Sequence, residues 1–259
     1  YQTTLERCFS WNNYKGFHKN GGTTIKFDTC FAQGGSFHFY IKDTLSATLI
    51  NCAGDQGKSI TTAEYTLSYF EGVRGLSIIG WDAEGNNISA ENTALMRFVN
   101  CTGMLTGFVG FSNKVTVPSG AEAYMFALSN SNMDFQGNHA ARNTGDWTIE
   151  GSPSAVYTFA ATDSRALLSS CVLDAATGGT PSARFGASAN PGSDVSQTNC
   201  VISGIVNNIK NLVGQTSGAF TPTLNSFTVT GSPVISGSYA ITGKVVNFTI
   251  TLNANGGTI

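Results

Sequence analysis

The sequence predicts an all-β protein in which a parallel β-helix, with about 22 residues per rung, is followed by a β-sandwich-like C-terminal segment. Three observations predict this fold: a four-residue pattern that returns at a fixed step, short alternating strands separated by glycine-rich corners, and a run of alternating segments near the C-terminus. We place the β-helix in residues 1–213 and the C-terminal segment in residues 214–259.

The repeated pattern is an apolar residue followed three places later by cysteine, as in LERC, FDTC and LINC. Cys8, Cys30 and Cys52 follow one another at a constant step of 22. The apolar residues repeat with the same step: Leu5, Phe27 and Leu49. A period of this length is typical of a solenoid, in which each turn buries its apolar side chains against its neighbours. The dense leucine signature of leucine-rich repeats is absent.

Later segments continue the pattern with larger intervals. Leu76 opens LSII at a step of 27 from Leu49, and Phe98 opens FVNC at a further step of 22. We also expect Phe9 to align with Phe31, and Phe17 with Phe39. Beyond this region alternation predicts further strands with longer loops, at residues 123–130, 156–163, 167–171 and 199–206.

The six cysteines are expected to be buried free thiols. Equivalent residues on neighbouring rungs lie side by side at about 4.8 Å, with parallel Cβ vectors that suit a disulfide poorly. Three disulfides remain the alternative.

Residues 201–213 allow two interpretations. Apolar residues at a spacing of four, three and four suit a one-sided helix, whereas β-branched residues and Gly204 favour a last rung that runs into a linker or stem. The four alternating runs that follow are too few for a closed sandwich. Either the chain is cut at Ile259, or these strands complete themselves against other subunits.

Composition excludes several classes of function. Only 12% of residues are charged and the net charge is -2, with no concentration of basic residues, so nucleic acid is not expected as a partner. No apolar run is long enough to predict membrane insertion. The sequence has no metal-binding motif, no phosphate-binding glycine loop and no Ser–His–Asp order, so neither a metal nor a cofactor is expected.

Two features together resemble bacteriophage tailspikes and tail fibres. One is the rung pattern over roughly residues 1–210, and the other is GAFTPTL followed by SYAITGKVVNFTI, which is similar to the GxFTPTL…GxY…GxxVxFxI pattern that closes many such proteins. The resemblance implies a right-handed β-helix, a homotrimer, and a location in the virion tail, acting at the bacterial cell surface. It also implies attachment to other tail proteins through an N-terminal module that this sequence lacks.

The same resemblance implies that the protein binds bacterial surface polysaccharide, either capsule or O-antigen, during host attachment. Many such spikes also cleave the polymer. Tailspike enzymes share no universal catalytic motif, so the resemblance assigns no catalytic residue.

Carboxylates recur at the predicted corners. The residues six places after each rung-opening position are Trp11, Gln33, Asp55, Asp82 and Met104. If the rungs stay in register, the carboxylates of Asp55 and Asp82 lie about 5 Å apart, as in a retaining glycosidase, and Glu84 lies at about 7 Å, nearer to inverting geometry. Close carboxylates separate into one acid and one base or nucleophile. The alternative is that these residues satisfy the backbone of the turns.

Other side chains are candidates for contacting a sugar. Trp81, close to the predicted carboxylate pair, can stack on a sugar ring. Trp11 can also do so, although packing in the interior is the alternative for Trp11. Tyr69, Glu71 and Arg74 come at the end of an insertion in the third rung, where a binding loop is expected. For Glu71 and Arg74 the alternative is a surface ion pair.

Two classes of function follow. The first is a depolymerase that cleaves surface polysaccharide by hydrolysis or lyase chemistry. The second is a non-catalytic adhesin or trimerisation stem of a tail fibre. A monomeric pectin-lyase-like enzyme is a third hypothesis, which leaves the C-terminal pattern unexplained.

Overall fold

The computed structural model describes residues 2–58, 66–89, 93–140, 147–213, 216–220, 234–242 and 245–253. All the regular elements in these ranges are β-strands, so the chain is all-β and has no helix among its described residues. Accordingly, no helix in these ranges is long and apolar enough to span a membrane. The chain divides into two compact units, Tyr1–Lys210 and Asn211–Ile259, and each is described by itself.

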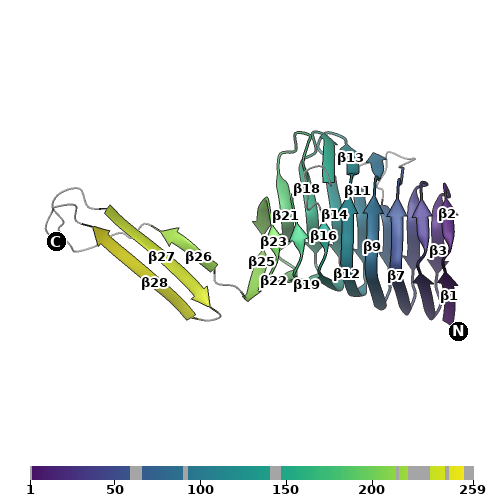
Figure 1. The fold of residues 1–259 in the computed structure, drawn as a ribbon, viewed down its shortest axis with the longest axis horizontal. Coiled ribbons are helices and arrows are strands. Elements are labelled where there is room, and N and C mark those ends of the chain that lie inside the picture. Colours follow the sequence, from purple (N-terminus) through teal and green to yellow (C-terminus); the bar gives the residue numbers. More distant parts are fainter. Residues whose placement is uncertain are drawn as a thin grey trace. The chain divides into compact units, whose positions relative to one another are not determined.

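The first unit contains two large parallel sheets (Figure 1). The strands of the first sheet lie in chain order: β1 (Gln2–Glu6), β4 (Thr24–Asp28), β7 (Ser46–Asp55), β9 (Gly75–Glu84), β12 (Thr102–Phe111), β15 (Asn132–Gln136), β19 (Arg165–Ser169), β22 (Asp194–Thr198) and β25 (Ile209–Val213), in which the unit ends. Short strands extend this sheet past a bend: β2 (Phe9–Trp11), β5 (Phe31–Gln33), β16 (His139–Ala140), β20 (Val172–Leu173) and β23 (Val201–Ile202).

In chain order, each strand of the second sheet comes between two strands of the first sheet. Its strands are β3 (Lys15–Asn20), β6 (Phe37–Lys42), β8 (Thr66–Glu71), β11 (Thr93–Val99), β14 (Glu122–Ser129), β18 (Ala155–Thr162), β21 (Arg184–Ala189) and β24 (Ile205–Asn207). A small third parallel sheet joins β10 (Asn87–Ser89), β13 (Asn113–Val117) and β17 (Trp147–Gly151). This ordered alternation is compatible with the predicted parallel β-helix.

The register confirms the predicted step for the first turns and corrects it afterwards. Leu5 aligns with Phe27, and Phe27 with Leu49. The predicted alignments of Phe9 with Phe31 and of Phe17 with Phe39 are confirmed. The next partner of Leu49 is Ile78, at a step of 29, and not Leu76. The longer turns include the strands of the third sheet, which the sequence period did not predict.

A left-handed residue explains the repeated pattern. Arg7, Thr29 and Asn51, which directly precede the cysteines, have φ of 51°, 53° and 50°. This conformation bends the chain, and the next side chain points into the interior, where Cys30 and Cys52 are fully buried. Later turns form the same bend with Gly80, Gly107, Gly137, Ser170 and Asn199. Glycine adopts positive φ without steric cost, and Asn tolerates it better than most residues.

The prediction for FVNC is wrong in its placement. Phe98 belongs to β11 of the second sheet, and Asn100 has φ of 52° at a different bend. Cys101 is therefore buried by the same local geometry but not in the column that contains Cys52. The same short pattern, an apolar residue followed three places later by cysteine, therefore occurs at two different bends of the chain.

All six cysteines are free thiols, as predicted. Cys30, Cys52, Cys101 and Cys171 are buried, whereas Cys8 and Cys200 are half-buried. Burial raises the pKa of Cys52 and of Cys101 to about 11.

We expect a thiol reagent to modify at most the two half-buried cysteines in the native protein and all six after denaturation, because a buried thiol is inaccessible and remains protonated. Titration with a chromogenic disulfide checks this, and Cys8→Ser should lower the native count. Detection of a Cys8–Cys30 disulfide by non-reducing mass spectrometry would contradict the expectation.

The second unit contains one antiparallel sheet in the order β26 (Thr216–Phe220), β27 (Val234–Thr242), β28 (Val245–Asn253). The predicted run within 221–233 lies outside the described residues. Residues 201–213 form the short strands β23, β24 and β25, so the helical interpretation of this stretch is wrong.

Candidate functional site

The candidate site lies on the outer side of the first sheet, beyond the bend. Trp11 aligns with Gln33, and Gln33 with Asp55, as the sequence predicts. Ala53 aligns with Asp82, so Asp55, two residues later, lies beside Glu84 on the neighbouring strand. Adjacent strands are about 4.8 Å apart, so the side chains of Asp55 and Glu84 start from neighbouring positions on the same face of the sheet.

This register corrects the predicted pairing of Asp55 with Asp82. The step between β7 and β9 is 29 and not 27, so Glu84 occupies the position expected for Asp82. Asp82 lies diagonally from Asp55, and Met104 lies before the bend, away from this column. We call Asp55, Asp82 and Glu84 the acidic cluster.

A buried asparagine holds the two strands of the acidic cluster in register. The side chain of Asn86 donates a hydrogen bond to the carbonyl of Gly54 at 3.0 Å and accepts one from the amide of Gly57 at 2.7 Å. These contacts flank Asp55 on β7, while Asn86 follows Glu84 by two residues. A shift of one strand would leave buried polar groups unsatisfied, which is costly. The register of the two backbone segments that carry Asp55 and Glu84 is therefore fixed by buried hydrogen bonds.

Burial and neighbouring charge perturb the carboxyl groups. Burial raises the pKa of Asp55 to about 6, and the negative charges of Asp82 and Glu84 add to this. The amide of Glu84, which donates to Asp55 Oδ1 at 2.9 Å, acts in the opposite direction. Burial, together with the charge of Glu84, also raises the pKa of Asp82. Asp82 Oδ1 is buried and has no hydrogen-bond partner within the described chain. Asp55 and Asp82 therefore remain protonated to a higher pH than ordinary carboxyl groups do.

A hollow is lined by Asp82, one of the three carboxylates of the acidic cluster. It has a volume of about 480 Å³ and lies at the bend, where Gly80 and Gly107 have no side chains to fill it. Its other described lining residues are Asn51, Cys52, Ala53, Trp81, Val109 and Phe111. The hollow is therefore walled by one carboxylate and several apolar groups.

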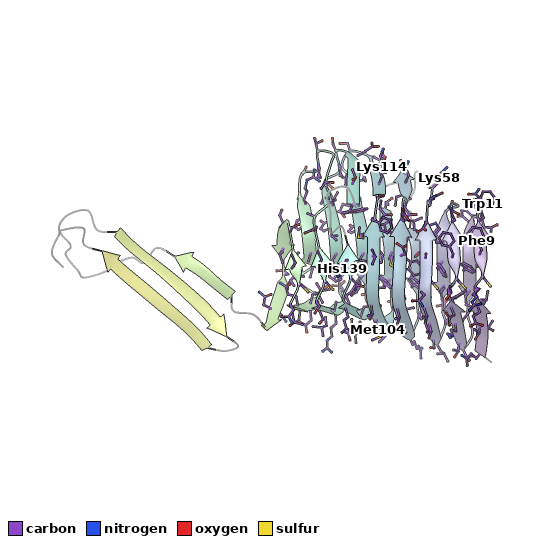
Figure 2. The ribbon with its side chains drawn as sticks, in the orientation of Figure 1. Phe9, Trp11, Lys58, Met104, Lys114 and His139 are labelled. Carbon is purple, nitrogen blue, oxygen red and sulfur yellow. The ribbon has the colours of Figure 1, made fainter. Side chains whose placement is uncertain are left out.

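Aromatic side chains lie on the same outer side, near the N-terminal strands. Trp11 is 66% exposed and Phe9 is 57% exposed. The ring of Phe9 stacks on that of Phe31, with centroids 5.3 Å apart. Figure 2 shows Phe9 and Trp11 together at this end of the sheet. Trp11 is thus placed to contact a ligand, and Phe9 is a further candidate that the sequence aligned without assigning a role to it.

The prediction that Trp81 stacks on a sugar ring does not hold. Trp81 follows Gly80 at the bend and therefore occupies the inward position that cysteine has on earlier turns. It is 3% exposed, and its ring packs against Phe39 at a centroid distance of 4.9 Å. Its position in the repeated pattern was the signal that could have shown this.

Tyr69, Glu71 and Arg74 do not join the acidic cluster. Tyr69 and Glu71 lie on β8 of the second sheet, where Tyr69 donates a hydrogen bond to Glu71 at 3.0 Å. Glu71 pairs with Lys42 at 2.6 Å, and not with Arg74, which is exposed. The insertion was expected between Asp55 and Leu76, and residues 59–65 of that stretch lie outside the described residues.

A buried histidine packs beneath the strand that carries Asp55. His38 is 1% exposed, and its imidazole lies against Gly54 and Gly57, where an added Cβ would meet the ring within 3.0 Å. Burial lowers the pKa of His38 to about 4, and a backbone contact with Gly34 offsets part of this shift.

Because the pKa of His38 is lower in the folded state than its usual value of 6.5, stability that is complete above pH 6.5 is lost as the pH falls toward 4. We expect a loss of about 3 kcal/mol in the free energy of unfolding over this range. Urea titrations at pH 7 and pH 4.5 check this, with His38→Phe expected to show a smaller difference and His139→Phe as the control. Equal pH dependence in wild type and His38→Phe would contradict it.

Within the part of the chain that the structure describes, no group of three or more His, Cys, Asp or Glu side chains is placed to hold a metal ion. Comparisons with models of known families, with curated proteins and with solved structures gave no match.

Proposed function

We propose that this protein is a bacteriophage tailspike or tail fibre component that binds, and cleaves, bacterial surface polysaccharide during host attachment. In this proposal the first unit is a right-handed parallel β-helix and three chains associate, at the virion tail. Two lines of support are the parallel sheets with ordered alternation and the resemblance of the C-terminal sequence to tail fibres.

The observation that carries the enzymatic part is the pairing of Asp55 with Glu84, with Asp82 diagonal to Asp55. Glycoside hydrolysis needs one carboxylic acid to protonate the leaving oxygen and one carboxylate to attack or to activate water. The raised pKa of Asp55, about 6, makes it the acid, and Glu84 or Asp82 serves as the base or nucleophile. Trp11, two strands from Asp55 in the same column, supplies a stacking surface for a sugar ring.

The test is incubation of the purified protein with a panel of capsule and O-antigen polysaccharides. Hydrolysis is measured as release of reducing ends, and lyase cleavage as the ultraviolet absorbance of the unsaturated product. We expect cleavage of at least one polymer at the acidic cluster, abolished by Asp55→Asn and by one of the two variants Glu84→Gln and Asp82→Asn, which identifies the base or nucleophile. Binding without cleavage across the panel would support the alternative of a non-catalytic adhesin.

One observation favours that alternative. Asp55 Oδ1 already accepts the Glu84 amide, which is what a carboxylate with a purely structural role at a bend does. The variant Asp55→Asn distinguishes the two proposals. If the protein is an adhesin, its affinity for polysaccharide should not change; if it is an enzyme, cleavage should be lost.

We expect the protein to be a homotrimer, because its C-terminal sequence resembles the pattern that closes trimeric tail fibres and tailspikes. Light scattering should give three times the chain mass of 27.2 kDa. A mass of one chain at micromolar concentration would contradict the trimer and leave the cleavage proposal to be judged on its own test.

A further inference from the structure

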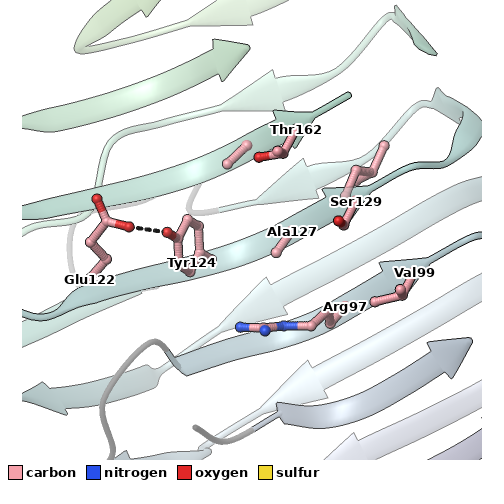
Figure 3. Close-up of a pocket in the computed structure, with 9 residues that line it drawn as sticks. Arg97, Val99, Glu122, Tyr124, Ala127, Ser129 and Thr162 are labelled. Carbon is pink, nitrogen blue, oxygen red and sulfur yellow. Dashed lines mark hydrogen bonds between the residues drawn. The ribbon is translucent and has the colours of Figure 1, made fainter. Parts of the chain in front are cut away.

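A second hollow lies on the outer side of the second sheet, away from the acidic cluster. It has a volume of about 410 Å³, within the usual range of ligand pockets. Figure 3 shows its walls, which are provided by β11, β14 and β18. The sequence had assigned no function to any of its residues.

Two small residues form the floor of this hollow. Arg97 aligns with Ala127, and Ala127 with Ala160. The aligned positions therefore change from a large side chain on β11 to methyl groups on β14 and β18. On the other side of Arg97 the column continues with Tyr69. The step from large to small side chains leaves an apolar platform flanked by polar walls, which suits the C–H face of a sugar ring.

One wall is built of ordered aromatic and acidic side chains. The rings of Tyr124 and Tyr157 stack with centroids 5.0 Å apart, and Phe185 extends the stack at 4.8 Å. Both tyrosine hydroxyls donate to the carboxylate of Glu122, to Oε2 from Tyr124 and to Oε1 from Tyr157 at 3.2 Å. Burial raises the pKa of Tyr157 to about 12, so it remains a neutral donor. This wall is therefore preorganised.

A cation and two hydroxyl groups complete the lining of the hollow. In Figure 3 the guanidinium of Arg97 extends toward the side where Tyr124 lies, whereas Ser129 and Thr162 lie on the other side. Val99 aligns with Ser129, and Ser129 with Thr162. A guanidinium has five N–H donors in a planar fork that matches a carboxylate, so it can serve a ligand in addition to its contacts within the chain. Ser129 and Thr162 can donate to and accept from sugar hydroxyls.

We propose that this hollow binds a sugar residue that carries one carboxylate, such as a hexuronate, with the carboxylate on Arg97 and the ring over Ala127 and Ala160. Glu122 accepts hydrogen bonds from the sugar hydroxyls and disfavours a doubly charged ligand such as phosphate, because a second negative charge beside it would be repelled. The site stands on its own geometry and does not require cleavage at the acidic cluster.

Saturation-transfer NMR with D-glucuronate and D-galacturonate tests the proposal, with D-glucose and D-galactose as neutral partners that differ only at C6. We expect saturation of at least one uronate, and at least about tenfold weaker binding of its neutral partner, the loss expected for one hydrogen bond to a charged group. Acetate, which shares the carboxylate but lacks the ring, should bind more weakly than the uronate.

Two variants locate the site. Arg97→Gln removes the charge and Ala127→Leu fills the floor at a solvent-facing position, so each should lose uronate binding without unfolding the protein. Arg165→Gln, an exposed arginine on β19 of the other sheet, is the matched control and should bind as wild type does. Asp55→Asn should also retain uronate binding, which separates this proposal from the catalytic one.

No transfer to either uronate, equal transfer to the neutral sugars, equal affinity for acetate, or unchanged binding in Arg97→Gln and Ala127→Leu would each overturn the proposal.

Discussion

Replacement of Asp55 by Asn is expected to lower polysaccharide turnover by about 100-fold to 10,000-fold, the usual contribution of general acid catalysis, while the melting temperature stays the same or rises. Asn cannot donate the acid proton. Its side-chain oxygen can still accept the Glu84 amide, now at 2.9 Å from Asp55 Oδ1, so the bend is preserved. The substitution also removes a half-buried charge that the folded state does not favour.

The sign of the stability effect follows from the direction of the pKa shift. The pKa of Asp55 is about 6 in the folded protein, above the usual 3.8. The stability that this group contributes is therefore complete below pH 3.8 and is lost as the pH rises through 6. Asp55→Asn should exceed wild type in melting temperature more at pH 8 than at pH 4.

The activity of the wild type should decline above pH 6, by about tenfold per pH unit once Asp55 is mostly ionised. Asp134→Asn, an exposed position on β15, is the matched control and should change neither activity nor melting temperature. Full turnover in Asp55→Asn would return this residue to a structural role at the bend.

Replacement of Phe135 by Ala is expected to lower the free energy of unfolding by about 3 to 5 kcal/mol, the usual cost of a large cavity in a packed core. Phe135 on β15 is fully buried and contacts three rings of the second sheet, with centroids 6.0 Å from Phe98, 5.5 Å from Phe126 and 5.3 Å from Phe159. Loss of this ring removes contacts that join one sheet to the other.

Urea unfolding followed by fluorescence measures the effect. The control is Met104→Ala on β12, whose side chain is 39% exposed and should change stability by no more than about 0.5 kcal/mol. If both variants lost the same stability, the phenylalanine cluster would not be the connection between the sheets.

The early turns could be predicted from the sequence because each has the same length and the same corner. Cys30 and Cys52 recur at the chain's period, and the alternation of strands depends only on which side chains are buried. The left-handed residue before each cysteine was not predicted, because Arg7 and Thr29 are not residues that signal positive φ.

The later register could not be predicted, because one local pattern serves two bends. Asn51–Cys52 and Asn100–Cys101 look alike in sequence but belong to different corners. The extra strands of the third sheet add residues at a place that the period cannot reveal. Because of this error in register at β9, Asp82 was predicted as the partner of Asp55, whereas the partner is Glu84.

The sequence thus identified all three carboxylates but not which two are opposite one another. It could not identify the second hollow at all, because that site depends on Arg97, Ala127 and Ala160 being aligned across three strands of unequal spacing. No short motif marks such an alignment.

The residues with left-handed conformation at the bends also suggest how the number of turns can change during evolution. A duplication of the gene from the codon of Thr29 to the codon before that of Asn51 begins and ends at equivalent corners, and so inserts one complete turn. The neighbouring turns keep their partners, but Trp11 moves away from Asp55 by one strand spacing, about 4.8 Å. That is roughly the length of one sugar residue. If the protein binds a saccharide as proposed, unequal crossing-over at these corners would change the length of saccharide that reaches from Trp11 to the carboxylates, with no substitution at either end.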